Sequence, residues 1–492
     1  MLAAILPGIA PFIAENMAPI MFGALVLFLL CGYPVAFALA ANGLFFGLIG
    51  IDVGLLKPEL MQALPNRVFG IMQNDTLLAI PFFSFMGLIL ERSGMAEDLL
   101  DTIGQLFGPI RGGIAYAVIF VGALLAATTG VVAASVISMG LISLPLMLKY
   151  GYDKKLASGV IAASGTLAQI IPPSLVLIVM ADQLGRSVGD MYQGAFLPGL
   201  VLTGFYAVYV LLVTLIKPEA APALPLEARS LRGMALFNRA IVALLPPLVL
   251  IFLVLGTIFL GIATPTEGGG MGAAGALLLA LFKRRLTWSL LRQALDSTTK
   301  LSCFVLFILV GSTVFGLVFR GVNGDLWVEH LLTALPGGQL GFLIVVNILF
   351  FCLAFFLDFF ELAFILVPLV GPVADKLGID LIWFGVLLGV NMQTSFMHPP
   401  FGFALFYLRS VAPKVVKTTE IYWGAVPFVV IQVIMVALII AFPKLVSHDA
   451  TKAKTEDVPL QIESPAENGD GQSGSSNSEP DAPQFSIQDD KK

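Results

Sequence analysis

The stretch "QIIPPSLVLI", residues 169–178, interrupts what otherwise reads as a membrane-spanning helix. Pro172 and Pro173 have no amide hydrogen, and each proline ring clashes with the preceding helical turn. Inside a bilayer, carbonyl groups that lose their helical partners find no water to bond. Such a break is tolerated only where protein or a water-filled cavity surrounds it. The stretch therefore predicts a broken helix at about residues 164–174, buried within the protein.

The composition of the whole chain is that of a membrane protein. Of its 492 residues, 58% are hydrophobic and 12% are charged, and the mean hydropathy is +0.94. Continuous apolar runs of about 20 residues or more recur along the chain, which predicts about ten to fourteen membrane passes or hairpins. The predicted fold class is an all-α polytopic membrane protein. The phosphate-binding pattern GxxxxGK[ST] is absent from the sequence, so we do not expect ATP to drive its activity.

The double proline recurs later in the sequence. Pro399 and Pro400 follow Pro172 and Pro173 after a shift of 227 residues. Matched breaks in two halves are typical of secondary transporters, whose binding site lies near the bilayer midplane where the breaks meet. A duplication without transport is the alternative, but it leaves the matched breaks unexplained. The same shift places Pro145, Lys149, Gly151 and Asp153 on Pro372, Lys376, Gly378 and Asp380.

The repeat divides the chain into four parts. The first transmembrane half covers residues 1–216, a polar and Pro-rich linker covers 217–239, and the second half covers 240–446. We expect a second broken helix at about 391–401, as the twin of the first. The tail, 447–492, is rich in Ser, Pro, Gly and acidic residues, a composition that buries no core and predicts disorder.

Each half also contains a long apolar run with polar residues at its centre and no polar loop. These runs, 122–140 and 352–372, predict re-entrant hairpins whose tips lie near Thr128–Gly130 and Leu357–Asp358. Asp358 followed by Glu361 fits an N-cap with an acidic residue three positions later. Carboxylates at membrane depth also mark ion or substrate paths. Capping and ligand binding are compatible, and both interpretations stay open for this pair.

Polar residues that precede the two double prolines suit an ion. They offer hydroxyl and amide oxygens beside carbonyls freed by the break, and Na⁺ is a hard cation that prefers oxygen ligands. Helix N-termini at the breaks suit the carboxylate of an anionic substrate. The sequence therefore predicts coupled binding of Na⁺ and an organic anion. The substrate candidates are Pro172, Pro173, Glu361, His398, Pro399 and Pro400, although a lone histidine such as His398 more often has a packing role.

A third acidic motif has a structural interpretation. In "GIATPTEGGGMGAAGA", Thr264, Pro265 and Glu267 occupy the N-cap, first and third positions of a capping box. The glycines that follow allow close helix packing. We therefore assign these three residues to helix capping. Nothing in the sequence indicates a cofactor, or a metal other than Na⁺.

Several motifs together resemble the large membrane subunit of tripartite ATP-independent periplasmic (TRAP) transporters. They are "GIATPTEGGGMGA" at 261–273, "SGTLAQIIPPS" at 164–174 and "NMQTSFMHPPFGFALFYL" at 391–408. Their detail most resembles the branch named for mannitol and chloroaromatic compounds. The resemblance implies a multi-pass protein of the bacterial cytoplasmic (inner) membrane that imports an organic acid with Na⁺. It also implies two inverted repeats, an elevator mechanism, a small four-helix membrane subunit and a periplasmic substrate-binding protein.

The resemblance also implies where the ions bind. Each site would pair a hairpin tip with the broken helix of the same half. The implied Na⁺ ligands are Thr128, Thr129, Gly130, Ser164, Gly165 and Thr166 in the first half, and Asp358, Asn391, Gln393 and Thr394 in the second.

Three other functions compete with this interpretation. A stand-alone Na⁺/organic-anion symporter could share the hairpin plan without a binding protein. A passive channel would not accumulate its substrate against a gradient. An integral-membrane enzyme would need convergent acids or histidines, and the sequence contains no paired DxxxD or HxxxH clusters. We therefore expect no enzyme and no nucleic-acid partner.

Overall fold

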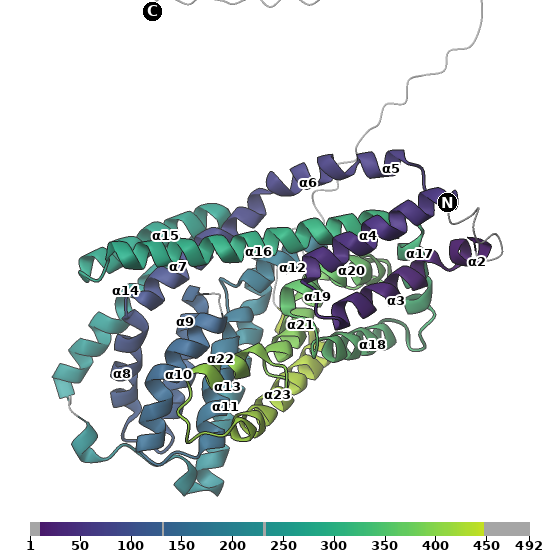
Figure 1. The fold of residues 1–492 in the computed structure, drawn as a ribbon. Helices are drawn as coiled ribbons and strands as arrows, with labels where there is room; N and C mark the ends of the chain where they lie inside the picture. Colours follow the sequence, from purple (N-terminus) through teal and green to yellow (C-terminus); the bar gives the residue numbers. More distant parts are fainter. Residues whose placement is uncertain (1–9, 130–131, 230–232, 447–492) are drawn as a thin grey trace, which may run out of the picture. The chain divides into compact units, whose positions relative to one another are not determined.

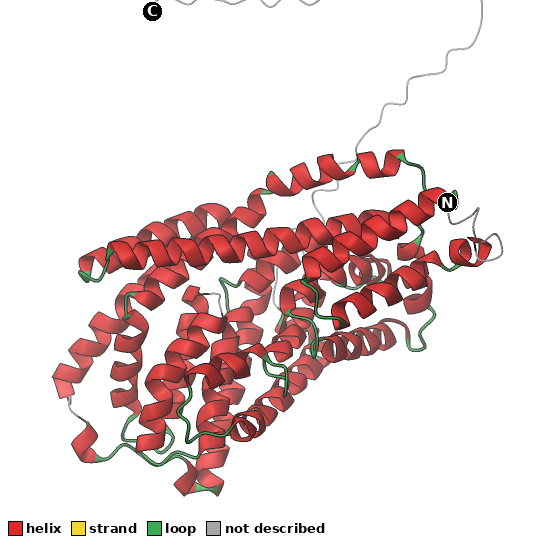
Figure 2. Cartoon of the chain, viewed as in Figure 1, coloured by secondary structure: helices red, strands yellow, loops and turns green. Residues whose placement is uncertain are grey.

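The computed structural model describes residues 10–129, 132–229 and 233–446, which form helices joined by loops (Figures 1 and 2). This confirms the all-α prediction for the described part of the chain, in which no strand occurs. Six described helices are long and apolar enough to cross a membrane, or up to eight if each bent pair is one span. This number of spans is lower than the about ten to fourteen passes or hairpins predicted from the apolar runs. Several apolar helices, such as Leu175–Leu184, are too short to cross a membrane alone.

The first half contains twelve described α-helices, which range from four to 29 residues. Its α-helices are α2 (Ala10–Glu15), α3 (Met17–Leu30), α4 (Val35–Asp52), α5 (Glu59–Gln62), α6 (Leu64–Met72), α7 (Ala79–Arg92), α8 (Met95–Phe107), α9 (Gly113–Thr129), α10 (Val132–Lys149), α11 (Lys154–Thr166), α12 (Leu175–Leu184) and α13 (Val188–Ile216).

The second half contains ten described α-helices. Its α-helices are α14 (Gly233–Phe259), α15 (Pro265–Phe282), α16 (Trp288–Gly321), α17 (Gly324–Thr333), α18 (Gly338–Leu353), α19 (Phe359–Ile365), α20 (Val367–Lys376), α21 (Leu381–Met392), α22 (Phe403–Val411) and α23 (Thr418–Ala441). In Figure 1, α4, α15 and α16 run across the top of the view, and the helices that flank the two breaks lie below them.

Helix ends in the two halves follow the 227-residue shift. Helix α10 begins at Val132 and ends at Lys149, and the shift turns these positions into the first residue of α19 and the last of α20. Helices α11 and α21 both begin with an aspartate cap: Asp153 accepts from the amide of Leu156 at 3.0 Å, and Asp380 accepts from Trp383 at 2.7 Å. The repeat is thus present in the helix ends. The predicted inverted relation of the halves stays a prediction.

Each half packs a helix against the other half. Helix α11 packs on α23, and its counterpart α21 packs on α13 as well as on α23 of its own half. Gly424 of α23 lies so close to α11 that a Cβ there would fall 2.2 Å from the Lys155 carbonyl oxygen. At the counterpart crossing, a Cβ on Gly194 would meet only side chains, with the Val446 and Ile382 methyl carbons at 3.0 and 3.2 Å. The first crossing is therefore the tighter one.

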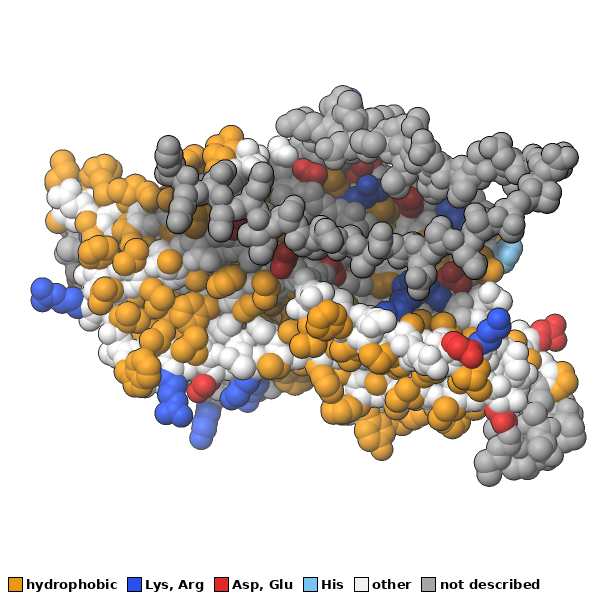
Figure 3. Space-filling model, turned by 90° about the horizontal axis from the view of Figure 1, so that it is seen from above, with side chains coloured by type: hydrophobic (Ala, Val, Ile, Leu, Met, Phe, Trp, Pro, Cys, Tyr) orange, Lys and Arg blue, Asp and Glu red, His pale blue; other side chains and the backbone are white. Residues whose placement is uncertain are grey.

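Large hydrophobic side chains cover much of the outer surface. Ile216, Phe252 and Phe282 are 75%, 81% and 79% exposed, respectively. In Figure 3, hydrophobic side chains cover much of the visible surface, and Lys and Arg lie at its left and lower edges and near its centre. A bilayer requires exposed apolar side chains, since lipid tails contact them.

Candidate functional site

The two breaks have the same local structure. Helix α11 gives way to a 3₁₀ turn at Leu167–Gln169, and α21 gives way to one at Gln393–Phe396. An irregular segment with a cis Pro–Pro peptide follows in each case, at Pro172–Pro173 and Pro399–Pro400. Helices α12 and α22 then resume the chain. The regular α-helix is thus interrupted in the same way at residues 167–174 and 393–402.

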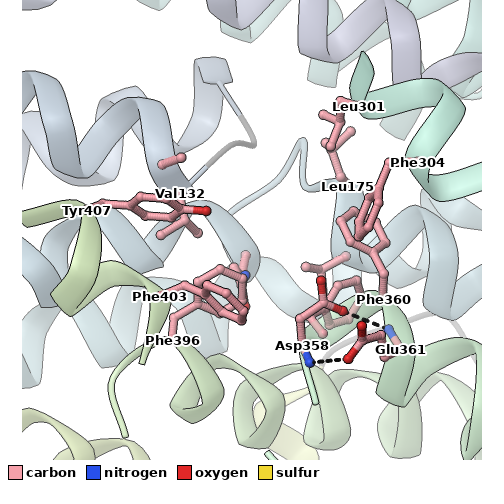
Figure 4. A pocket seen from close by; sticks show the side chains of 14 residues that line it. Val132, Leu175, Leu301, Phe304, Asp358, Phe360, Glu361, Phe396, Phe403 and Tyr407 are labelled. Atoms are coloured by element: carbon pink, nitrogen blue, oxygen red, sulfur yellow. Dashed lines mark hydrogen bonds between the residues drawn. The ribbon is translucent and has the colours of Figure 1, made fainter. Parts of the chain in front are cut away.

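A cavity of about 460 Å³ lies between the breaks and the hairpins (Figure 4). Four helices begin at its wall, because the first residues of α10, α12, α19 and α22 all line it. The partial positive charge of a helix N-terminus attracts anions. The lining residues are Val132, Ala133, Gln169, Leu175, Val176, Leu301, Phe304, Asp358, Phe359, Phe360, Glu361, Phe396, Phe403 and Tyr407.

The acidic pair at the second hairpin forms the capping box that the sequence predicts. Asp358 accepts a hydrogen bond from the Glu361 amide, and Glu361 accepts one from the Asp358 amide, each at 2.9 Å. The pair also lines the cavity (Figure 4). One carboxylate oxygen of each residue is thus used for capping, and the same pair supplies the acidic part of the cavity wall.

Buried side-chain oxygens without a hydrogen-bond partner gather at the two breaks. Ser164 Oγ and Gln169 Oε1 belong to the first break, and Gln393 Oε1 and Ser395 Oγ belong to the second. None of these four side chains is more than 3% exposed, and their free oxygens have no partner among the described residues. A buried polar atom without a partner is costly, so each needs a ligand, an ion or a water.

One hydrogen bond joins the two breaks directly. Gln393 Nε2 donates to Thr166 Oγ1 at 3.0 Å, across the 227 residues of the repeat shift. The two residues therefore occupy the same position in their own halves. The Thr166 hydroxyl in turn donates to the Ala163 carbonyl at 2.8 Å. Both side chains are fully buried, so this contact ties the two half-sites together inside the protein.

Other predicted ion ligands lie near this contact. The Thr394 hydroxyl donates to the Asn391 carbonyl at 2.7 Å, which leaves its oxygen lone pairs free to accept. Asn391 donates to the backbone and side-chain oxygens of Asn347, both at 2.8 Å. Gly165 lies against Val136, with space for no side chain. The structure thus joins the second break to Ser164–Thr166 through Gln393, while Asp358 lies in the cavity wall.

The tip of the first hairpin is only partly described. Helix α9 ends at Thr129 and α10 begins at Val132. The side chains of Thr128 and Thr129 and the whole of Gly130 lie outside the described residues. Their predicted role as Na⁺ ligands stays a prediction.

The predicted substrate residues separate into two groups. Glu361 lines the cavity, whereas His398 and the four prolines do not. Pro172 and Pro173 are buried, and Pro400 is exposed. His398 is 1% exposed and stacks on Phe355 with ring centroids 4.2 Å apart. Both ring nitrogens of His398 are also buried without a hydrogen-bond partner among the described residues, so it stays a candidate ligand beside its packing role.

Sequence reasoning missed the aromatic wall of the cavity. Six of the 14 lining residues are aromatic. Phe396, Phe403 and Tyr407 flank the second double proline, so their position near a break was a usable signal. Phe304 lies on α16, far from any motif, and only the fold brings it to the cavity.

The remaining acidic motif is a cap at the start of α15. Thr264 is the N-cap, Pro265 is the first helical residue, and the Thr264 amide donates to Glu267 at 2.8 Å. The Glu267 amide donates back to Thr264 Oγ1 at 3.2 Å. Among the described residues, no group of three or more His, Cys, Asp or Glu side chains is placed to hold a metal ion.

The cavity just described and the helices that line it lie within a match to a known protein family. Residues 22–445 match the family model of the tripartite ATP-independent periplasmic transporter, DctM component. The chain belongs to this family. The permease is therefore a multi-pass transport component of the bacterial cytoplasmic membrane. It is 31% identical to the C4-dicarboxylate TRAP transporter large permease protein DctM of Pseudomonas aeruginosa, over 81% of this chain and 91% of that protein.

Other relatives of the permease are named for different ligands. It is 29% identical to the sialic acid TRAP transporter large permease protein SiaM of Vibrio cholerae, over 85% of this chain and 94% of that protein. Among solved structures, the YdaH transporter of Alcanivorax borkumensis superposes with a TM-score of 0.54 at 16% identity, over 80% of this chain and 91% of that one. That likeness concerns the fold alone.

Proposed function

We propose that the permease imports a small organic anion, such as a 2-oxo or hydroxy acid, together with Na⁺. The unpartnered buried oxygens at the two breaks carry this proposal, because they are the ligand type that Na⁺ prefers. Na⁺ would be a coupling ion, moved with the substrate and not held as a cofactor. The names of the two relatives, a C4-dicarboxylate and a sialic acid permease, support an anionic substrate.

The proposed movement is that of an elevator. In this mechanism the breaks and hairpins would carry the cavity across the membrane as one body, against the outer helices. Two inverted repeats would supply similar outward-facing and inward-facing arrangements of the same parts. The matched helix ends of the two halves support this proposal. The branch named for mannitol and chloroaromatic compounds remains part of it as a prediction.

The proposed complex has three proteins. A small four-helix membrane subunit would pair with the exposed apolar side chains of the permease within the lipid bilayer, and a periplasmic binding protein would deliver the substrate. Family membership supports both partners. A stand-alone symporter would need neither. Uptake into liposomes that contain this chain alone would therefore contradict the three-protein proposal.

The test of Na⁺ coupling is uptake by the three-protein complex in liposomes under an inward Na⁺ gradient. Substrate should accumulate against its own gradient and should stop doing so when K⁺ replaces Na⁺. Ser164→Ala and Ser395→Ala should raise the Na⁺ concentration for half-maximal uptake, because each removes a free oxygen at a break. Thr166→Ala and Thr394→Val should also raise the Na⁺ concentration for half-maximal uptake.

Ser143→Ala is the matched control. Ser143 is also fully buried with an unpartnered hydroxyl, but it lies in the body of α10 away from the breaks. Its replacement should leave the Na⁺ dependence unchanged. Equal shifts in Ser143→Ala and Ser164→Ala would mean that the break oxygens have no special part in ion binding.

A further inference from the structure

The cavity contains acidic and aromatic side chains and no basic one. Among the described residues that line it there is no Lys, Arg or His, and the polar side chains are Gln169, Asp358, Glu361 and Tyr407. A ligand with two ionised carboxylates would place its second charge near the acidic pair. Charges of one sign repel strongly in such a site, and no side chain in the wall compensates them.

Two aromatic pairs stand on opposite walls of the cavity. Phe304 and Phe360 have ring centroids 6.1 Å apart at 84°, on the side of the acidic pair. Phe396 and Phe403 have centroids 6.1 Å apart at 55°, on the other side. Figure 4 shows the space between these pairs. A flat ring that enters this space would meet aromatic partners on both walls in the tilted geometries that such rings prefer.

The wall with Phe403 is also the one suited to a single carboxylate. Helix α22 begins at Phe403, and its N-cap Gly402 has no side chain to bond the first amides. The Tyr407 hydroxyl points into the cavity (Figure 4). Gln169 lines the cavity, is 3% exposed and has an amide oxygen without a partner. The amide nitrogen of the same side chain is a hydrogen-bond donor for an anion, while its oxygen remains available to an ion.

The opposite helix start is already occupied by acids. The first amides of α19 are bonded by the carboxylates of its own Asp358 and Glu361. An incoming anion therefore finds donors at α22 and like charge at α19. The two ends of the cavity therefore differ: the end at α22 can bind one negative group, and the end at α19 repels it.

We infer that the substrate is a monocarboxylate with an aromatic ring. Its carboxylate binds at the start of α22 beside Tyr407 and Gln169, and its ring lies between the two aromatic pairs. A dicarboxylate is a poor ligand for this cavity. The inference rests on the proposed function as an anion importer and narrows its substrate class.

The test compares three probes on the purified full-length permease by thermal shift in NaCl and in KCl. The probes are 3-phenyllactate, succinate and phenethylamine. We expect 3-phenyllactate to bind at least about tenfold more tightly than succinate in NaCl, because only it matches both walls. Equal or tighter binding of succinate in NaCl would overturn the inference and leave the proposed function intact. Tighter binding of phenethylamine would mean that the acidic pair recognises a cation. Binding of neither anion would contradict both proposals.

Variants separate recognition from folding. Tyr407→Phe removes only the hydroxyl and should weaken 3-phenyllactate binding about tenfold, the effect of losing one hydrogen bond to a charged group. Phe403→Ala should weaken it as well. Phe406→Ala is the control, since Phe406 lies on the same helix, is 49% exposed and does not line the cavity. If Phe406→Ala weakens binding as much as Tyr407→Phe, the proposed wall is wrong.

Discussion

The two predicted hairpins have matching helix ends but different charges. The predicted hairpin of the first half, residues 122–140, contains no acidic residue, whereas that of the second half carries Asp358 and Glu361 where α19 begins. Under the repeat shift, the first and last residues of α10 match the first residue of α19 and the last of α20. The repeat therefore preserves where helices start, and the side chains at those starts decide what each half can bind.

The same contrast appears at the helix crossings between the halves. Gly424 touches the backbone of α11, while Gly194 meets only side chains of α21 and Val446. A backbone contact cannot relax by a rotamer change, but a side-chain contact can. Glycines at the two crossings thus differ in their tolerance to substitution. Four predictions test these differences between the halves.

The largest effect is expected at the second hairpin. Asp358→Ala removes both the cap and the charge, so we expect at least about a tenfold loss of uptake and a stability loss of about 1–2 kcal/mol. Asp358→Asn keeps a good N-cap and removes only the charge, so its melting temperature should stay near that of the parent while its Na⁺ dependence changes. Uptake and thermal unfolding of the purified variants measure both effects.

Asp375→Ala is the control for these variants. Asp375 lies on α20, just after the predicted hairpin, and is exposed, with Arg186 at 3.5 Å. Its loss should leave uptake and melting temperature nearly unchanged. If Asp358→Ala also behaves like the parent protein, the acidic pair is dispensable and the hairpins do not differ in function.

A smaller effect should follow at the crossings. Gly424→Ala should destabilise the permease by about 1–3 kcal/mol, because the new methyl group meets the Lys155 carbonyl oxygen of α11. Gly194→Ala should cost less than about 1 kcal/mol, since its neighbours are movable side chains. Thermal unfolding in detergent compares the two. Equal losses would show that the crossings are equally tight.

The contact between the breaks should contribute about 1 kcal/mol. A double-mutant cycle of Thr166→Val and Gln393→Leu should give a coupling of about 0.5–1.5 kcal/mol in unfolding free energy. Gln393→Leu with Thr203→Val should be additive, because the Thr203 hydroxyl bonds only within its own helix. Additivity in the first cycle as well would mean that the halves are not coupled through this bond.

The smallest effect is expected at the start of α15. Thr264→Ala should cost about 1 kcal/mol or less, because it removes an exposed cap. Helix α4 occupies the matching position in the first half and begins after Pro34 without any side-chain cap bond. In the variant, α15 should begin without a side-chain cap, as α4 does, and the protein should keep full uptake. A loss of uptake without loss of stability would assign Glu267 a role beyond capping.

Several site features could be read from local sequence. The Asp358–Glu361 and Thr264–Glu267 boxes were predictable because a cap depends on residues three positions apart. The breaks were predictable because proline removes a donor wherever it stands. The bond from Gln393 to Thr166 and the aromatic wall with Phe304 were not, since neither follows from spacing along the chain.

The sequence by itself determined that this protein is helical, lies in a membrane and is broken at two matching places, because hydropathy and proline act locally. It also marked the polar residues of both breaks. Only the tertiary structure decided which of these polar residues contact one another. Gln393 reaches Thr166, and Phe304 reaches the cavity, because helices of the two halves pack against one another. Such contacts arise from packing between segments far apart in the chain, which no local pattern encodes.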